Sequence, residues 1–136
     1  MPLKIVVDAV EARLSANWKK CPVVGINLTG DVPNGPEPFV QVSYPVANGE
    51  QLTVGAPGEN VYRETGAFRL VVNARRGKGV AEGLAWADEL AALFRGQEFD
   101  GVQTFAPSSP AIDDRNDEGK YFVLSIAVPY QADILG

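Results

Sequence analysis

The stretch LVVNARRGKGVAEGLAWADEL, residues 70–90, decides how the rest of the chain is interpreted. It begins as an apolar strand, passes through a turn with Gly77 and Gly79, and continues as a helix that contains Gly83. These glycines approach the pattern that holds the pyrophosphate of a dinucleotide, and Asp100 follows 17 positions after Gly83, near where a ribose-binding carboxylate would stand. The stretch is therefore either a nucleotide-binding turn or a tight turn between a strand and a helix.

The surrounding sequence favours the tight turn. A dinucleotide-binding fold needs repeated strand–helix–strand units, whereas this chain offers one such unit and only 53 residues after Gly83. Glycine permits a positive φ and close backbone packing without any ligand, so we expect Gly79→Ala to damage folding rather than ligand affinity. We expect no cofactor, and a small cytosolic nucleotide- or ligand-binding domain that uses Gly77, Gly79 and Arg75 is the least favoured alternative.

Two segments outside the turn have apolar residues at helical spacing. Residues 4–18 place Val6, Val7, Val10, Leu14 and Trp18 on one stripe, which predicts an amphipathic helix. Residues 78–95 predict a second helix, and Gly96 is placed to cap its end. The predicted buried face of this second helix comprises Val80, Leu84, Ala87, Leu90, Ala91 and Phe94.

The remaining segments predict strands. Residues 61–74 alternate between an apolar face and a face with arginines, which is typical of a strand with one solvent-exposed face in an antiparallel sheet. Asn48-Gly49 predicts a hairpin turn between two of the strands. The expected strands span residues 23–28, 39–46, 51–54, 61–74, 98–105 and 120–132. The order α-β-β-β-β-α-β-β predicts a single α+β domain over residues 1–136, with two helices packed on a mainly antiparallel sheet.

The composition narrows the classes of function that the chain can have. Hydrophobic residues make up 46% of the 136 residues, as expected of a folded globule. The chain contains no histidine, so it lacks the commonest general base and the commonest metal ligand. The net charge of −5 disfavours free nucleic-acid binding. Cys21 is the only cysteine, and the apolar run of residues 5–7 is too short for a leader or a membrane span, so we expect a cytoplasmic protein that does not enter membranes.

The acidic loop near the C-terminus imitates a calcium-binding loop. Asp114, Asn116, Glu118 and Gly119 occupy its positions one, three, five and six. Position twelve is Ser125, where a bidentate glutamate is required, and no predicted helices flank the segment. We therefore predict no metal site. The serines lack a base that could activate them, so we expect no hydrolytic or redox activity.

Some residues are better candidates for protein contacts than for chemistry. Trp86 lies off the apolar stripe of its helix, which makes it a candidate interface residue. The pair Arg75-Arg76 could bind an anion near the start of the second helix, but such a pair is more often a solvated or interface face. The loops over residues 29–38 and 107–119 are long and rich in proline, glycine and charge, so we expect them to move in the free subunit and to become ordered on assembly. The candidate interface residues are Arg63, Arg69, Arg75, Arg76, Trp86, Asp113, Asp114, Asp117 and Glu118.

The C-terminal two-thirds has a recognisable arrangement. Arg63 and Gly66 precede a long strand, which is followed by the Gly-x-Gly turn and a helix that ends in AALF (residues 91–94). Pro107 then follows a strand, and an aromatic strand ends in VPY (residues 128–130). Together with the N-terminal VEARLSANW, this arrangement resembles the small tail-terminator-like proteins of long-tailed phages, the gpU-like group, over most of the chain.

The resemblance implies a structural function. Members of this group form a ring, typically of six subunits, at the upper end of the tail tube, where the ring stops tube polymerisation and offers a surface to the head-side connector. The implied partners are other copies of the chain, the tail tube protein and the connector protein, in the host cytoplasm during assembly and then in the virion tail. The resemblance implies no catalytic residues, no cofactor and no metal. The nearer alternative is another phage neck or tail-joining protein of the same fold.

Overall fold

The computed structural model describes residues 3–21, 23–24, 39–75, 81–112 and 121–136. These residues form two helices and a mixed, mainly antiparallel sheet, so the predicted α+β fold is confirmed. The elements are α1 (Lys4–Asn17), β1 (Val23–Val24), β2 (Phe39–Gln51), β3 (Val61–Arg75), α2 (Ala81–Phe94), β4 (Glu98–Phe99), β5 (Val102–Thr104), β6 (Ala111–Ile112) and β7 (Tyr121–Leu135).

The sheet is organised around two long central strands. Its order is β1-β2-β3-β7-β5-β4, and β6 also pairs with β7. Strands β3 and β7 run antiparallel along their whole length, from Val61 opposite Leu135 to Arg75 opposite Tyr121. The pair β1–β2 is parallel, whereas the other described pairs are antiparallel.

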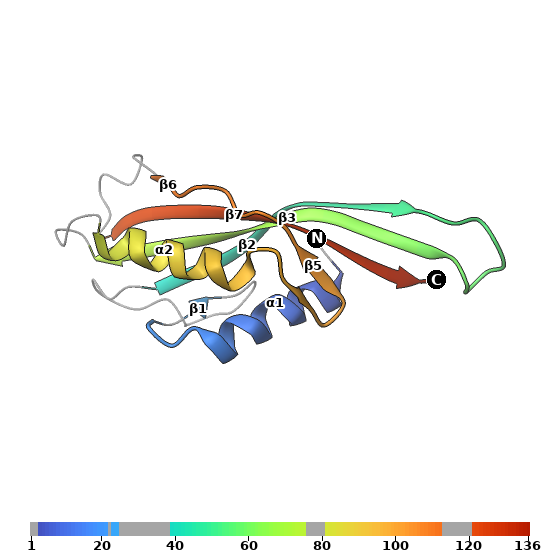
Figure 1. Ribbon diagram of the computed structural model, residues 1–136, viewed down its shortest axis with the longest axis horizontal. Helices are drawn as coiled ribbons and strands as arrows, with labels where there is room; N and C mark the ends of the chain where they lie inside the picture. The colour runs from blue at the N-terminus through green and yellow to red at the C-terminus, as the bar shows by residue number, and fades with distance from the viewer. Residues whose placement is uncertain (1–2, 22, 25–38, 76–80, 113–120) are drawn as a thin grey trace.

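Both helices cover the same face of the sheet (Figure 1). Alternate residues of β3 and β7 point toward them, because side chains on a strand alternate between its two faces. Phe68 stands at the centre, with its ring edge-on to Phe94 at 5.0 Å between centroids. The buried cluster includes Val6, Val10, Leu14, Val42, Leu70, Val72, Leu90, Leu124, Ile126 and Val128.

The predicted faces of the helices are largely confirmed. In α1 the expected residues Val6, Val10 and Leu14 are buried, and Trp18 is buried just beyond it. In α2 the prediction for Leu84 is wrong, since its side chain is 36% exposed. Gly83 faces the sheet instead, so closely that a Cβ there would lie 2.7 Å from Leu124 Cδ1.

The end of α2 follows the prediction. The helix ends at Phe94, and Gly96 adopts a φ of 58°, the left-handed conformation that commonly ends a helix.

The predicted hairpin at Asn48-Gly49 is wrong. Strand β2 continues through both residues, which lie opposite Thr65 and Glu64 of β3. The separate strand predicted over residues 51–54 is also wrong, because β2 ends at Gln51 and the chain turns over residues 52–60. Long-range pairing with β3 overrides the local turn preference of Asn-Gly here.

The strand predicted over residues 98–105 is a small hairpin. Asp100 and Gly101 have φ values of 48° and 84°, the pair of positive values that a type I′ turn between two strands requires. Asp100 is therefore a turn residue. The described start of the loop predicted over residues 107–119 is also tied to the sheet, because Ser108 bonds to Ala127 through its N–H (2.8 Å) and its hydroxyl (2.9 Å).

A bulge divides β2 into two parts. Its pairing with β3 jumps from Ser43 opposite Arg69 to Val46 opposite Ala67, so β2 carries one extra residue there. The extra residue reverses which side chains face the helices, because the side-chain period of a strand is two. Strand β3 passes very close at this point: a Cβ on Gly66 would lie 2.1 Å from the carbonyl oxygen of Val46.

Candidate interaction surface

The strands extend beyond the helices as a projecting arm (Figure 1). We define the arm as residues 46–66 together with residues 130–136, which comprise the ends of β2, β3 and β7 and the turn between β2 and β3. Apart from the start of α1, which reaches the root of the arm, the helices lie beside the other half of the sheet, so the arm exposes both of its faces beyond its root (Figure 1).

The arm tip, residues 52–60, is held by a compact set of hydrogen bonds. The Thr53 hydroxyl accepts a bond from the Val61 N–H (2.9 Å) and lies 3.3 Å from Asn60 Oδ1. The Asn60 amide donates to the carbonyl of Gly55 (3.3 Å), and the Asn60 backbone exchanges two bonds with Gly136 at the C-terminus. The tip is therefore ordered by its own side chains and by the end of β7.

This ordered tip exposes apolar side chains. Val54 is 95% exposed and Leu135, beside the tip, is 71% exposed. Leu52 adds a third exposed aliphatic side chain, in the same cross-strand row as Val61 and Leu135. Exposed aliphatic side chains gathered on a rigid projection are typical of a surface that another molecule covers.

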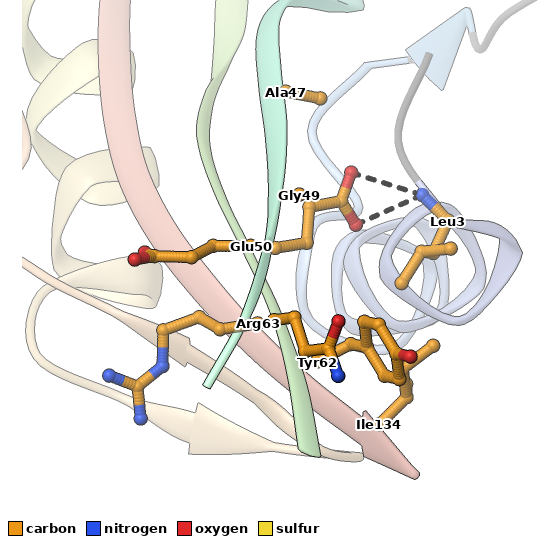
Figure 2. Close-up of a pocket in the computed structure, with 9 residues that line it drawn as sticks. Leu3, Ala47, Gly49, Glu50, Tyr62, Arg63 and Ile134 are labelled. Atoms are coloured by element: carbon orange, nitrogen blue, oxygen red, sulfur yellow. Dashed lines mark hydrogen bonds between the residues drawn. The ribbon is translucent and has the colours of Figure 1, made fainter. Parts of the chain in front are cut away.

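A groove lies at the root of the arm, on the side of α1 (Figure 2). Its volume is about 460 Å³, within the range that binding grooves have. Aliphatic or aromatic side chains of Leu3, Ala47, Tyr62 and Ile134 form part of its walls. The charged ends of Glu50 and Arg63 point away from Leu3 and Tyr62 in the view of Figure 2. The lining residues are Leu3, Ala47, Gly49, Glu50, Gln51, Tyr62, Arg63, Glu64 and Ile134.

Glu64 joins the arm to the start of α1. Its carboxylate, on a residue only 6% exposed, accepts bonds from the Leu3 N–H at 3.2 and 3.0 Å. Leu3 is the residue that precedes α1 and has no side-chain cap, so Glu64 supplies the acceptor and the negative charge that a helix N-terminus favours. This contact fixes the wall of the groove that Leu3 provides.

Two tyrosine hydroxyls, those of Tyr44 and Tyr130, are buried and have no well-aligned hydrogen-bond partner among the described residues. Burial raises the pKa of both, and the nearby carboxylates, Glu11 for Tyr44 and Glu64 for Tyr130, raise it further. Both tyrosines therefore stay neutral at physiological pH. They contribute to the packing of the sheet: their rings lie 6.3 Å and 6.2 Å from that of Phe68.

The predicted interface residues Arg63 and Arg69 of β3 lie on the face opposite the helices. Arg63 forms a bidentate ion pair with Asp133, at 2.8 and 3.0 Å, and this partner lowers the pKa of the Asp133 carboxyl. Arg69 is exposed and its Nη2 lies 3.3 Å from the Ser125 hydroxyl. Arg75 ends β3 opposite Tyr121, and only its backbone is described. Their role at an interface stays a prediction.

Trp86 is half-buried, and its ring meets that of Trp18 edge-on at 5.7 Å. This contact links α2 to the end of α1, and an interface role for Trp86 stays a prediction. The other candidates, and the glycine-rich turn between β3 and α2, lie outside the described residues: Arg76, Gly77, Gly79, Asp113, Asp114, Asp117 and Glu118.

Of the residues that form the arm tip and line the groove, only Arg63 is among the candidates chosen from the sequence. The sequence offers one signal for the arm tip, the aliphatic pair Leu52 and Val54 in a segment rich in turn formers. The same pair also fits the short strand that the sequence predicts over residues 51–54. The described part of the chain holds no group of three or more histidine, cysteine or acidic side chains arranged to bind a metal. Neither of its helices has the length and apolarity to cross a membrane.

Comparison with known proteins identifies the family. The profile of a family described as phage tail terminator protein matches residues 5–130. A solved structure with 21% sequence identity superposes with a TM-score of 0.59 and covers 97% of this chain and 96% of its own; identity this low shows the fold alone. No curated protein matches the sequence.

Proposed function

The chain belongs to the phage tail terminator family, and on that premise we propose that it closes the head-side end of a tail tube as a ring of identical subunits, six in number. The ring ends polymerisation of the tube protein and offers a surface to the head-side connector. Family membership makes the chain a phage tail protein, which belongs in the virion tail. We propose that it assembles there from the host cytoplasm.

The observation that carries this proposal is the projecting arm with an apolar tip and a groove at its root. A ring closed by rotation uses heterologous contacts, so every subunit must present two different patches that fit each other. The tip is convex and its Val54 is uncovered, whereas the groove is concave and has the apolar side chains of Leu3, Ala47, Tyr62 and Ile134 in its walls. A monomeric binding protein would need no such projection.

The proposed role is structural and requires no catalytic step. It depends on surfaces, and the single domain over residues 1–136 supplies them without a cofactor. The predicted candidates Arg69 and Trp86 lie on other parts of the described surface, available for contact with the tube or the connector, whereas Arg63 lies at the groove with its charged end on the opposite face.

The test combines native mass spectrometry or light scattering with purified tail tubes. We expect a weak equilibrium between monomer and ring that rises with concentration, and also with salt, because screening weakens repulsion between subunits of net charge −5. Added tubes should act as a template and acquire capped ends that stop growing. A protein that stays monomeric and leaves tubes elongating is not a terminator. A ring that binds the connector but ignores tube ends would be a neck or joining protein.

A further inference from the structure

The arm tip presents a side chain that its own chain does not cover. Val54 is 95% exposed, in a turn that Thr53 and Asn60 hold in one conformation. A pre-ordered segment loses little conformational freedom on binding, so its apolar side chain can contribute most of its burial energy to a contact. The backbone N–H groups of Val54 and Gly55 donate no hydrogen bond within the described chain.

The root groove has the complementary shape and chemistry. Leu3, Ala47, Tyr62 and Ile134 give it apolar walls around a volume of about 460 Å³. Gly49 leaves it open, because a Cβ built there meets nothing within 4 Å. The Glu64 carboxylate in its lining is an acceptor for N–H groups, as its bonds from the Leu3 N–H show.

We propose that the arm tip of one subunit seats Val54 in the root groove of a second copy of this chain. This inference rests on the ring proposed above and names the contact that builds it. A second copy is the occupant because each chain carries both a knob, the arm tip with Val54, and a socket, the root groove. Because the knob and the socket differ in shape, the contact is head-to-tail. The N–H groups of Val54 and Gly55 would face Glu64 in the groove. One small apolar contact of this kind is weak by itself, so rings form when several contacts close together or when a tube end templates them.

The first test separates the knob from the socket. Val54→Asp disables the tip and leaves the groove, whereas Gly49→Trp fills the groove and leaves the tip. Each variant alone should associate about tenfold or more weakly than the unsubstituted protein, the loss expected for one buried valine. Mixed together, they should form a dimer, since one intact tip then meets one intact groove, but no ring.

The matched control is Asn48→Trp, beside Gly49 on the opposite face of the arm. It should associate like the unsubstituted protein. Circular dichroism and thermal unfolding check that all three variants fold. Unchanged association of Val54→Asp and Gly49→Trp would overturn the proposal, and so would a mixture that associates no more strongly than either variant alone.

A cross-link tests the same contact directly. Cys21→Ser removes the native thiol while keeping an acceptor for the Trp18 indole, and Val54→Cys with Gly49→Cys places one thiol on the knob and one in the socket. Oxidation should give a ladder of covalent oligomers that ends at the size of the ring. Bands that stay at the monomer at concentrations where the protein associates would contradict the proposal.

The outcomes distinguish this inference from the proposed function. If rings or tube caps form equally well with Val54→Asp and Gly49→Trp, the proposed knob-and-socket contact is overturned and the proposed terminator function still stands. A Val54→Asp protein that still forms rings but no longer caps tubes would make the tube protein the occupant of the contact, which also overturns the assignment to a second copy. Cross-linked oligomers that never cap a tube would support the contact and count against the function.

Discussion

The same three strands build two regions of opposite character. Under the helices, β3 and β7 bury Phe68, Leu70 and Ile126 almost completely in an apolar cluster. In the arm the strands continue past the bulge in β2, and apart from Tyr130 and Ala132, which still belong to the buried cluster, their side chains are mainly polar, small or exposed. Burial of apolar area stabilises the first region, whereas backbone pairing, an ion pair and the hydrogen bonds of the tip order the second. Ordered structure outside the core is thus available for contact with another molecule.

The largest difference should come from truncating an aromatic side chain in the core. Phe68→Ala removes a ring that packs against Phe94, Tyr130 and Tyr44, so we expect the free energy of unfolding to fall by about 3–5 kcal/mol. Val54→Ala at the arm tip should change it by less than about 0.5 kcal/mol, because the side chain is exposed. Urea unfolding of both variants measures the contrast. Similar losses would mean that the arm tip is part of the core.

The next effect concerns the point where the two regions join. Gly66→Ala pushes a Cβ to 2.1 Å from the Val46 carbonyl oxygen, so the strands must separate at the bulge, at a cost of about 1–3 kcal/mol. Gly49→Ala is the matched control on the neighbouring strand, with open space around the new Cβ, and it should leave stability unchanged or slightly higher. Thermal unfolding compares them. Equal stability would show that the close approach at Gly66 is not a constraint.

A smaller effect is expected where α1 meets the arm. Glu64→Gln keeps a hydrogen-bond acceptor for the Leu3 N–H but removes the negative charge at the helix N-terminus, so stability should fall by about 0.3–1 kcal/mol. Amide exchange in the first turn of α1 should accelerate. Glu59→Gln, at the arm tip and without a side-chain partner in the described structure, is the control that should change neither. Exchange that stays slow in Glu64→Gln would indicate that packing alone holds the helix start.

The smallest effect belongs to the exposed ion pair of the arm. Arg63 holds the pKa of Asp133 below its ordinary value, so the pair contributes fully above the unfolded pKa of about 4 and is lost as the pH falls through the lower folded value. In Arg63→Gln the pKa of Asp133 should return toward the ordinary range, as an NMR titration of the carboxyl would show. Arg69→Gln, on the same face but away from Asp133, should not move it. A pKa unchanged by Arg63→Gln would exclude this cause.

Much of the core could be predicted from the sequence. The stripe of Val6, Val10 and Leu14 and the alternation through Phe68 and Leu70 are local patterns, and each reports burial in the chain's own interior. The prediction for Leu84 failed because Gly83, which has no side chain to count as apolar, faces the sheet instead. The resemblance to tail terminators, carried by the same turns and apolar segments, is confirmed by the family comparison.

The arm could not be predicted in the same way. Asn48-Gly49 is a strong local turn signal, yet both residues pair with β3, and the reversal occurs at residues 52–60. The shift in register at the bulge then decides that Ala47, Gly49 and Gln51 share the face of the arm on which the groove lies. No local pattern records that register, because it depends on which residues of a distant strand lie opposite.

The sequence by itself determined the fold class, the two helices, the apolar faces of the long strands and the family, because all of these follow from the spacing of residues near one another in the chain. The tertiary structure alone decided that the strands extend beyond the helices and that Gly66 lets β2 and β3 approach closely at a bulge. It also decided that Leu3, Glu64 and Ile134 lie together around a groove. Those features arise from contacts between residues far apart in sequence, and such contacts form only once the whole sheet is paired.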